Sequence, residues 1–323
     1  MSPLALASAP IDHLIRRSRL LGATREWFQR EGFHEVQTPV LSRDCIIDQH
    51  LDPIACTPPH PALDSAPFWF LQTSPEQHMK RLLASGMKRI YQIGPVFRLG
   101  ESGRLHNPEF TMLEWYSSPG GHQQGIDELT QLVGHLLLRP EPVQVTYREA
   151  FLGAVGLDPL EASSEDLAAR SIEMGHADSP SWATDRDDWL DLLFSMAVQP
   201  TLGHSAPTVV THFPASQAAL ARISDQDPRT AERYELFVDG VELANGYHEL
   251  LDPAILKSRQ QAANQWRRMH GKSPLPERNW LLDAMEIGLP ACSGCALGWD
   301  RLVMIACGVD SIDQVVAFPV HRA

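Results

Sequence analysis

Hydrophobic and polar positions follow a helical period in two early segments of the chain. In residues 11–31 apolar side chains recur with a helical rhythm at Ile11, Leu14, Ile15, Leu21 and Phe28. A short extended run is predicted over 33–36. A second helix is predicted over 75–86, because Ser74, a proline at the first helical position and Gln77 match the pattern of a capping box.

Two strands are predicted over 89–99 and 109–116, joined by a polar loop. Side chains in a strand point alternately to opposite faces. One face of the second strand therefore carries Phe110, Met112, Glu114 and Tyr116. That face mixes an aromatic ring, a carboxylate and a phenol, so the strand is a candidate for a binding surface.

A β-hairpin is predicted where an Asp-Gly pair at 239–240 separates the runs 234–238 and 241–244. If the residues that flank the turn face each other, Glu235 lies diagonally from Glu242 on one face of the hairpin. Two neighbouring carboxylates repel each other unless a cation lies between them. The hairpin is therefore a candidate cation site, and a solvated acidic surface is the alternative.

The remaining segments carry less chemistry. Residues 120–200 are rich in leucine and acidic residues and are predicted to be a helical insertion without a chemical motif. Residues 294–308 indicate a glycine-punctuated turn that runs into an apolar helix closed by Gly308. A single domain over residues 1–323 is expected.

Composition places the chain among ordinary globular proteins. Its 323 residues are 43% hydrophobic and 21% charged, which suffices for a large core. No stretch approaches the ~20 apolar residues of a membrane helix, and the first residues lack the basic region of a secretory signal. A soluble cytoplasmic protein without a membrane partner is expected.

Cysteine count and charge narrow the possible partners. The five cysteines are an odd number and are expected to be reduced thiols. Cys292 and Cys295 are expected to be structural, because no second pair completes a zinc site. The chain has 40 acidic and 27 basic residues and a net charge of -13. Nucleic acids are bound mainly through cationic contacts with phosphates, so a tRNA partner is disfavoured.

Three segments, in this order, resemble the motifs of the class II aminoacyl-tRNA synthetases. They are G-F-H-E-V-Q-T-P-V-L after the first helix, F-R-L-G-E-S-G-R-L-H-N-P-E-F-T-M-L-E-W-Y in the strand-loop-strand region, and G-C-A-L-G-W-D-R near the C-terminus. One segment alone would be weakly specific, but their order and spacing extend over almost the whole chain. The resemblance implies an α+β fold, with an antiparallel sheet flanked by helices, and a homodimer formed through the first motif.

Within this family, H-N-P-E-F-T-M-L-E-W-Y and E-L-A-N-G-Y-H-E are similar to the lysyl branch. The first motif region begins close to residue 11, so an anticodon-binding domain is not expected. These features resemble a truncated subgroup that modifies elongation factor P instead of tRNA. The resemblance implies an ATP-dependent ligase that activates (R)-β-lysine, or lysine, as an adenylate. The enzyme would transfer it to a lysine side chain of elongation factor P and release AMP.

The resemblance also implies which residues bind ATP. Arg98 would bridge the amino-acid carboxylate and the α-phosphate, a role that suits a planar guanidinium group. Arg104 and His106 would contact the phosphates. Phe110 would stack under the adenine, and Arg301 would lie over it and reach the γ-phosphate. Arg98 and Arg301 are thus the implied catalytic residues.

Glu235 and Glu242 are implied to hold Mg2+ on the β- and γ-phosphates, which agrees with their predicted shared face. Recognition of the adenine edge stays unassigned. The family usually carries Arg-x-Glu in the second motif, whereas here Gly100 stands at the glutamate position and Glu101 follows it. Either the loop is shifted by one residue or adenine recognition is rearranged.

The implied amino-acid pocket is rich in carboxylates. Glu114 and Glu249 would face the distal ammonium group, and Tyr116 and Tyr247 would close the walls. Each carboxylate at ~4 Å attracts an ammonium group by about 4 kcal/mol at an effective dielectric near 20, before desolvation. Glu76 would bind the other amino group.

Three further residues concern the carboxylate end of the substrate. Asn245 would help to orient the carboxylate, and Gly246 predicts a bulge that turns Asn245 toward the face of Glu242. Ser74 and Ala296 stand where lysyl-tRNA synthetases generally have alanine and glycine. That difference favours a non-standard lysine isomer.

Two alternative functions stay open. A lysyl-tRNA synthetase-like enzyme that charges tRNA is opposed by the acidic charge and by the missing anticodon domain. A non-catalytic lysine-binding regulatory protein is opposed by the residues that are predicted to bind magnesium and ATP, because a sensor does not need them.

Overall fold

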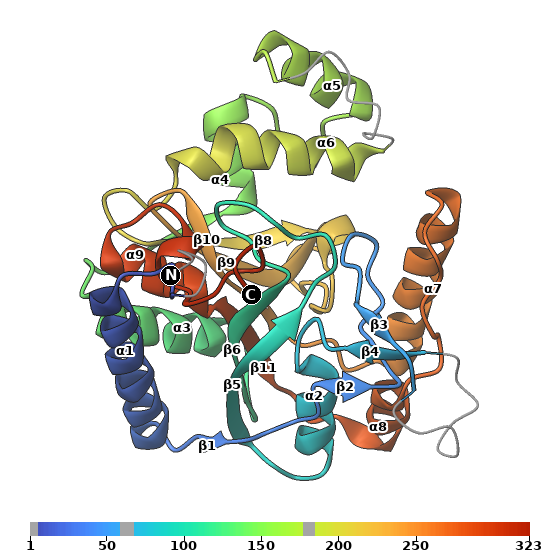
Figure 1. Cartoon of the computed structure of the whole chain (residues 1–323). Helices are drawn as coiled ribbons and strands as arrows, with labels where there is room; N and C mark the ends of the chain where they lie inside the picture. Colours follow the sequence, from blue (N-terminus) through green and yellow to red (C-terminus); the bar gives the residue numbers. More distant parts are fainter. Residues whose placement is uncertain (1–5, 59–67, 177–184) are drawn as a thin grey trace. The chain divides into compact units, whose positions relative to one another are not determined.

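The computed structural model of the chain describes residues 6–58, 68–176 and 185–323. The chain divides into two compact units: unit 1 comprises Met1–Gly120 and Leu250–Ala323, and unit 2 comprises Gly121–Glu249 (Figure 1). The two ends of the sequence therefore build unit 1 together, and the middle builds unit 2.

Unit 1 contains four neighbouring strands in the order β1-β5-β6-β11. They are β1 (His34–Glu35), β5 (Arg89–Phe97), β6 (Glu109–Ser117) and β11 (Ser293–Gly298). β1 is parallel to β5, whereas β6 pairs antiparallel with β5 on one side and with β11 on the other. β6 is thus paired on both sides, which holds its side chains in fixed directions.

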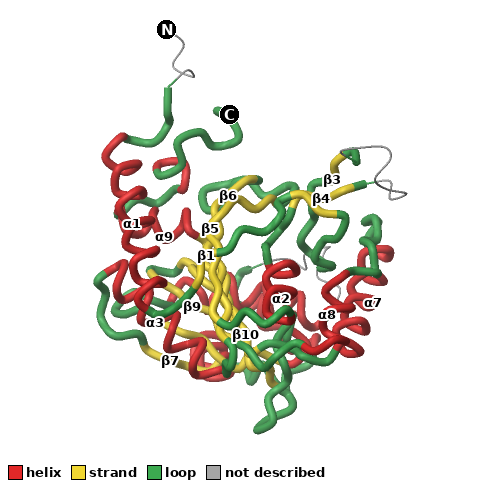
Figure 2. Tube along the Cα trace, turned by 90° about the horizontal axis from the view of Figure 1, so that it is seen from below, coloured by secondary structure: helices red, strands yellow, loops and turns green. Residues whose placement is uncertain are grey.

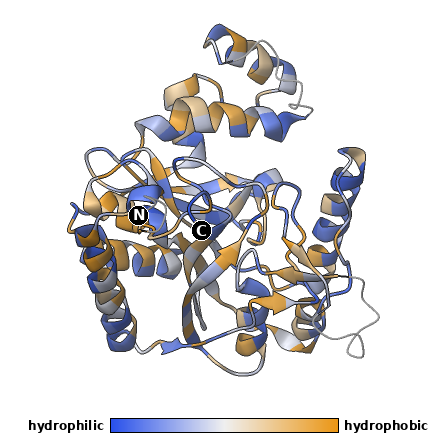
Figure 3. Ribbon diagram, in the orientation of Figure 1, coloured by the Kyte–Doolittle hydropathy of each residue, from blue (hydrophilic) through white to orange (hydrophobic). Residues whose placement is uncertain are grey.

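The helices of unit 1 are α1 (Ile11–Arg30), α2 (Glu76–Ala84), α7 (Pro253–Met269), α8 (Trp280–Gly288) and α9 (Trp299–Cys307), with the short η5 (Ile312–Gln314). A small sheet has the order β2-β4-β3, formed by β2 (Leu41–Ser42), β4 (Trp69–Leu71) and β3 (Ala55–Cys56). Helix α8 contacts both α2 and α7, and Figure 2 shows the three together. Helix α7 is coloured mainly hydrophilic in Figure 3.

Aromatic rings and one ion pair anchor helix α1. Phe28 stacks on Tyr91 of β5, with ring centroids 4.2 Å apart, and meets Trp115 of β6 at 5.7 Å. Arg17 of α1 pairs with Asp300 of α9 at 2.5 Å. These contacts hold together β5, β6 and α9, the elements that carry or adjoin several predicted site residues.

Unit 2 contains four neighbouring strands in the order β10-β9-β8-β7. They are β10 (Val241–His248), β9 (Thr230–Val238), β8 (Thr208–Pro214) and β7 (Val143–Thr146). Its helices are α3 (His122–Leu137), α4 (Tyr147–Val155), α5 (Ser164–Glu173) and α6 (Arg186–Leu193), with the short η2 (Phe194–Val198), η3 (Gln199–Thr201) and η4 (Ala215–Gln217). Capping boxes begin α4, α5 and α6, which fixes where these short helices start.

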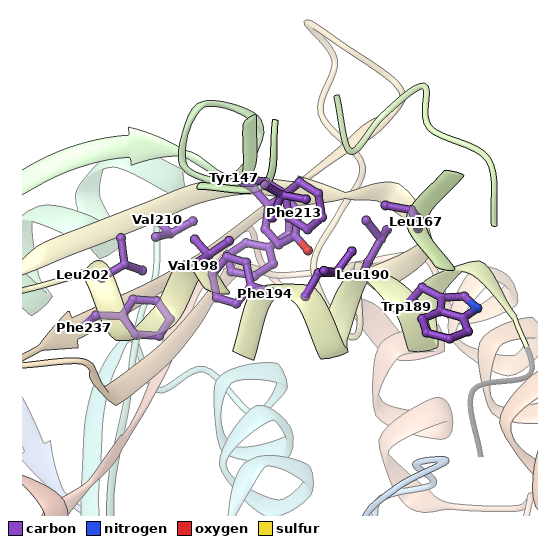
Figure 4. Packing of buried hydrophobic residues seen from close by; sticks show 13 residues of the cluster. Tyr147, Leu167, Trp189, Leu190, Phe194, Val198, Leu202, Val210, Phe213 and Phe237 are labelled. Carbon is purple, nitrogen blue, oxygen red and sulfur yellow. The ribbon is translucent and has the colours of Figure 1, made fainter. Parts of the chain in front are cut away.

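A hydrophobic cluster joins the helices of unit 2 to its strands (Figure 4). Tyr147 of α4 stacks on Phe194 of η2, with ring centroids 4.8 Å apart. Phe194 also meets Phe213 of β8 at 6.0 Å and Phe237 of β9 at 5.9 Å. Burying several large aromatic rings stabilises the packing strongly, so β9 is held from this side by the helical segment.

Most predicted elements are confirmed within a residue or two. These are the first two helices and the two strands around the polar loop. The β-hairpin is also present, and each of its strands is four residues longer than predicted. The expected capping box at Ser74 is wrong, because Pro75 is the N-cap residue and Gln77 donates to the carbonyl of Cys45 at 2.8 Å. The expected turn before the last helix is also wrong. It is strand β11, and the helix after it ends at Gly308 with φ +68°.

The predicted helical insertion contains α3 to α6 and also strand β7, and its residues 177–184 lie outside the described part of the chain. Cys292 and Cys295 are both buried, reduced thiols. Among the described residues, no helix combines the length and the hydropathy that a membrane crossing requires.

Candidate active site

Glu114 is the centre of a buried polar cluster in unit 1. It lies on β6 with an exposed fraction of 2%. Its carboxylate accepts hydrogen bonds from the Ser74 hydroxyl and from the Tyr116 hydroxyl, both at 2.6 Å. Ala296 of β11 is the cross-strand partner of Glu114, so its methyl group lies on the same face. The structure thus brings together four residues that the sequence assigned to the amino-acid pocket.

Glu76 and Lys80 form a second buried polar pair, one turn apart on α2. The Lys80 ammonium group donates to the Glu76 carboxylate, and the two side chains are 3% and 10% exposed for Lys80 and Glu76. The Lys80 ammonium also lies 6.0 Å from the ring centroid of Tyr116. The sequence analysis overlooked Lys80, although the i, i+4 spacing of Glu and Lys on a helix was the available signal.

The environment of Glu114 shifts its acidity. Burial and, to a lesser extent, the neighbouring charge of Glu76 raise the pKa of Glu114 to about 7. The hydrogen bonds from Ser74 and Tyr116 and the charge of Lys80 oppose the increase in pKa. A carboxylate in such a place gains from an added cation, because the cation offsets the cost of burying its charge.

Arg98 and Phe110 lie together next to the polar loop of unit 1. The Arg98 guanidinium carbon is 5.0 Å from the Phe110 ring centroid. One of its nitrogens lies 3.5 Å from the Glu101 carboxylate. Gly100 has φ +83°, a left-handed conformation that favours glycine. The glycine at the family's glutamate position therefore lets the chain turn, and Glu101 reaches Arg98 from the next position.

His106 and Arg301, which are both predicted to bind phosphates, lie in contact with each other. The Arg301 guanidinium lies 2.7 Å from His106 Nε2 and donates to the Leu105 carbonyl at 3.3 Å. Arg104 instead donates to the Asp310 carbonyl at 2.8 Å. The described contacts of Arg104 are thus with the C-terminal segment, and its contact with phosphates stays a prediction.

The hairpin of unit 2 carries the predicted metal ligands. Val241 pairs with Val238 and Glu242 with Phe237, as expected. The register then shifts between Glu242 and Ala244, and Asn245 pairs with Glu235. The predicted bulge is therefore present, but it lies at Leu243 and not at Gly246. Because of it, Glu242, Asn245 and Glu235 share one face, and so does Tyr247, which pairs with Arg233.

Gly246 has a different role from the expected one. A Cβ atom at this position would lie 2.3 Å from Cζ of Tyr234 on the neighbouring strand. The ring of Tyr234 therefore lies directly against the backbone of β10, on the face opposite to Asn245. Gly246 permits this close approach, which a larger residue would prevent.

Glu235 is buried and paired with an arginine. Arg233 donates to its carboxylate at 2.5 Å and also to the Gln217 carbonyl at 2.7 Å. Burial and the charge of Glu242 together raise the pKa of Glu235 to about 7, although Arg233 opposes the increase. The two glutamates therefore repel each other, and Arg233, which was not predicted as part of this site, is the cation that binds Glu235.

The remaining predicted pocket residue, Glu249, follows β10 in unit 2. It is 1% exposed, and its backbone forms a bridge with Ala221. The Oδ1 atom of Asn245 is buried and has no hydrogen-bond partner in the described part of the protein. No group of three or more metal-ligating side chains occurs among the described residues. Two carboxylates nevertheless suit Mg2+, which proteins commonly hold with one or two carboxylates together with substrate phosphates.

The match to known families extends over nearly the whole chain. Residues 7–322 match the family described as tRNA synthetases class II (D, K and N). The chain therefore belongs to this family of class II synthetases, as its motifs predicted. The predicted α+β fold is confirmed.

The chain is also similar to proteins named elongation factor P-(R)-beta-lysine ligase. It is 44% identical over 318 residues to the one from Vibrio cholerae, covering 98% of both chains. It is 44% identical over 312 residues to the one from Vibrio parahaemolyticus, covering 97% of both. For the one from Yersinia enterocolitica the identity is 42% over 316 residues, covering 98% of this chain and 97% of the relative. The resemblance to the truncated subgroup is confirmed.

Proposed function

We propose that the chain is an ATP-dependent ligase that activates (R)-β-lysine as an adenylate and transfers it to a lysine side chain of elongation factor P. The relatives named above support the reaction. The observation that carries the substrate class is the buried carboxylate of Glu114, held by two hydroxyl groups beside Ala296. A buried carboxylate selects a cationic amine over a neutral side chain, because a neutral ligand leaves its charge uncompensated.

In the first step an oxygen of the substrate carboxylate attacks the α-phosphorus of ATP. A bond forms between this oxygen and phosphorus, the bond to the leaving pyrophosphate breaks, and the aminoacyl adenylate results. Two anions must approach each other, and Arg98 offsets their repulsion with a guanidinium group that can bind both. Phe110 beside Arg98 provides the ring on which the adenine stacks, and Arg301 with His106 binds the phosphates.

Glu235 and Glu242 are the proposed ligands of Mg2+. Their shared face and their mutual repulsion support this role. When bound, the metal ion would neutralise charge on the β- and γ-phosphates. Arg233 keeps Glu235 compensated on its other side, so that the carboxylate stays in place.

In the second step the amine of the acceptor lysine attacks the carbonyl carbon of the adenylate. An amide bond forms, the bond to the phosphate oxygen breaks, and AMP leaves. The amine must lose a proton, which passes to solvent or to the leaving phosphate. None of the residues proposed for the pocket is assigned as a general base.

A homodimer formed through the region of helix α1 is part of the proposal. Ile11 and Ile15 of α1 are 66% and 45% exposed, and a dimer interface over this helix would bury both side chains. Sedimentation of the purified protein would measure the mass directly. A monomer at micromolar concentration would refute the dimer and leave the ligase activity as a separate question.

The activity is tested by pyrophosphate exchange and by acceptor choice. The expected result is exchange that depends on (R)-β-lysine and a lesser rate with lysine, followed by labelling of elongation factor P and no labelling of tRNA. Labelling of tRNA alone would favour a tRNA-charging enzyme. Binding of lysine without any exchange would favour a regulatory protein. Either outcome would refute the proposal.

A further inference from the structure

Arg17 of helix α1 lies where three elements of unit 1 meet. Its guanidinium group pairs with one carboxylate oxygen of Asp300 on α9 at 2.5 Å and donates to the Thr111 hydroxyl of β6 at 2.9 Å. The other carboxylate oxygen of Asp300 accepts a hydrogen bond from the Thr111 backbone N–H at 2.9 Å. The three residues therefore form a closed set of contacts, which we call the Arg17 triangle.

Anchoring of α1 does not by itself explain this triangle. Near the start of the helix, Nδ1 of His13 lies 2.9 Å from the Gln314 carbonyl oxygen. Near its end, Phe28 stacks on Tyr91. A largely buried ion pair is weak support for stability, because desolvating both charges offsets most of their attraction, and Asp300 is 4% exposed. The role of the triangle therefore follows from the residues beside it.

The triangle lies directly beside two of the residues that are proposed to bind ATP. Thr111 follows Phe110 on β6, and Asp300 precedes Arg301 in the first turn of α9. Side chains alternate along a strand, so Thr111 points to the face opposite to Phe110. The triangle therefore joins the backbone that carries Phe110 to the backbone that carries Arg301, from the face that the adenine does not occupy.

Asp300 continues the pairing of β6 beyond the end of β11. The backbone pairing of these two strands ends at Gly298, which lies opposite Met112. Thr111 is the next residue along β6, and its N–H donates to the Asp300 side chain instead of to a backbone carbonyl. A side chain can rotate where a backbone carbonyl cannot, and Arg17 holds the second oxygen of this carboxylate. Arg17 thus fixes the link between β6 and the start of α9.

We propose that Arg17 is a positioning residue for ATP, which sets the spacing between Phe110 and Arg301. The adenine is expected to lie between the ring and the guanidinium group, so a shift of α9 relative to β6 changes the width of this slot. Without Arg17 the buried Asp300 carboxylate loses its ion-pair partner and its fixed direction. The inference rests on the proposed function for the placement of the adenine, and Arg17 itself does not contact ATP.

The test compares the binding of AMP with that of lysine, each measured alone by calorimetry. AMP carries adenine but no γ-phosphate, so it reports on the slot, whereas lysine reports on the pocket of Glu114. Arg17→Met should weaken AMP binding about tenfold, roughly 1.4 kcal/mol. Lysine binding should be unchanged, because the pairing of β11 with β6 holds the part of β6 around Glu114 independently. Arg17→Lys keeps a cation beside Asp300 and should retain most of the affinity for AMP.

A double-mutant cycle separates this role from general destabilisation. If Arg17 acts by holding Asp300, Asp300→Asn should also weaken AMP binding, and Arg17→Met should add little in that background. Effects that multiply would overturn the proposal. Arg25→Met is the matched control, because Arg25 lies on the same helix and pairs with Glu35 at 3.1 Å. Its affinity for AMP should equal that of the wild type.

Unchanged AMP binding in Arg17→Met would overturn the proposal, and so would an equal loss of affinity for AMP and lysine. If this variant does not fold, Thr111→Val decides, because it removes only the hydroxyl that Arg17 binds. It should weaken AMP binding about threefold and spare lysine binding, and unchanged AMP binding would again overturn the proposal. If the wild type binds AMP but shows no pyrophosphate exchange, the proposed function fails, and the comparison of AMP with lysine still reports on Arg17.

Discussion

The two units each contain a buried glutamate whose pKa is raised to about 7, but they compensate it differently. In unit 1, Glu114 accepts hydrogen bonds from two hydroxyl groups, and the nearby cation Lys80 binds the other glutamate. In unit 2, an arginine binds the buried Glu235 directly and is itself held by a backbone carbonyl and by the Phe213 ring, 4.5 Å from its centroid.

This difference agrees with two kinds of ligand. Hydroxyl groups can reorient, and a carboxylate has about four acceptor positions, so Glu114 can accept an entering ammonium group without losing an ion pair. Glu235 stays paired with Arg233, and the acceptor positions that Arg233 does not use are available beside Glu242. The first arrangement suits a substrate that binds and leaves, and the second suits a metal ion bound together with phosphates.

The largest effect is expected from removing the fixed cation of unit 2. Arg233→Met leaves Glu235 buried and unpaired and should lower the free energy of unfolding by about 3–5 kcal/mol. Chemical denaturation measures this loss. Arg139→Met is the control, because the pair of Arg139 and Asp239 is largely exposed, 2.6 Å long, and should contribute about 0–1 kcal/mol. Equal losses in the two variants would show that the buried pair of Arg233 and Glu235 contributes no more to stability than the exposed pair does.

The next effect tests the metal assignment. Replacing Glu235 and Glu242 together by glutamine should slow adenylation by about a hundredfold, roughly 2.7 kcal/mol, and raise the magnesium concentration needed for half-maximal exchange. Binding of lysine without ATP should survive in this variant. If its magnesium dependence equals that of the wild type, the shared acidic face does not hold the metal.

A smaller effect is expected from pH. The raised pKa of Glu114, about 7, means that its carboxyl group is mostly protonated near pH 6 and mostly ionised near pH 8. A substrate ammonium group prefers the ionised form, so lysine should bind about tenfold more tightly at pH 8 than at pH 6, roughly 1.4 kcal/mol. Calorimetry at both pH values measures this, and Glu114→Gln should remove most of the dependence.

The stability of the ligand-free protein should change with pH in the opposite direction. Between the ordinary pKa of 4.5 and the raised value of about 7, the native state binds more protons at Glu114 than the unfolded state does. Stability from this group is therefore lost as the pH rises through that range. A thermal melting point that is independent of pH in wild type and Glu114→Gln alike would contradict the raised pKa.

The smallest effect concerns the choice of isomer. The Ser74 hydroxyl accepts a hydrogen bond from the backbone N–H of Glu76, the residue predicted to bind the proximal amino group, and Ala296 lies opposite Glu114 on the neighbouring strand. A methyl-sized change contributes ~1–3 kcal/mol of selectivity. Ala296→Gly, alone or with Ser74→Ala, should shift preference toward α-lysine by about tenfold. Competition of the isomers in pyrophosphate exchange gives the ratio, and an unchanged ratio in both variants would locate isomer selection elsewhere.

Local patterns predicted much of the fold and part of the site. The alternation of side chains along β6 was sufficient to put Glu114 and Tyr116 on one face, and the Asp-Gly turn was sufficient to put Glu235 and Glu242 on one face of the hairpin. Both inferences depend on short-range geometry alone. Strand β11 was missed because its glycines and small residues favour a turn locally, whereas pairing with β6 overrides that preference.

The importance of Lys80 and Arg233 depends on their burial, which a sequence pattern does not reveal. Lys80 follows Glu76 at a spacing that is common on solvated helices, and only the packing of α2 makes the pair buried. Arg233 stands two residues before Glu235, on the same face, but its importance follows from the low exposure of both side chains. The bulge at Leu243 contains no glycine, so the sequence pattern predicted the bulge at Gly246 instead.

The bulge at Leu243 adds one residue to β10 and so changes which of the later side chains lie on each face of the strand. Before the bulge, β10 places Glu242 on the face that it shares with Glu235. After the bulge, Asn245 and Tyr247 lie on this same face, although each is an odd number of residues from Glu242 and would point the other way in a regular strand. If β10 kept Leu243 but ran as a regular strand without the bulge, Gly246 and His248 would lie on this face in place of Asn245 and Tyr247. One residue inserted between Leu243 and Asn245 should therefore turn Asn245 and Tyr247 away from Glu235, whereas loss of Leu243 itself should leave both on that face.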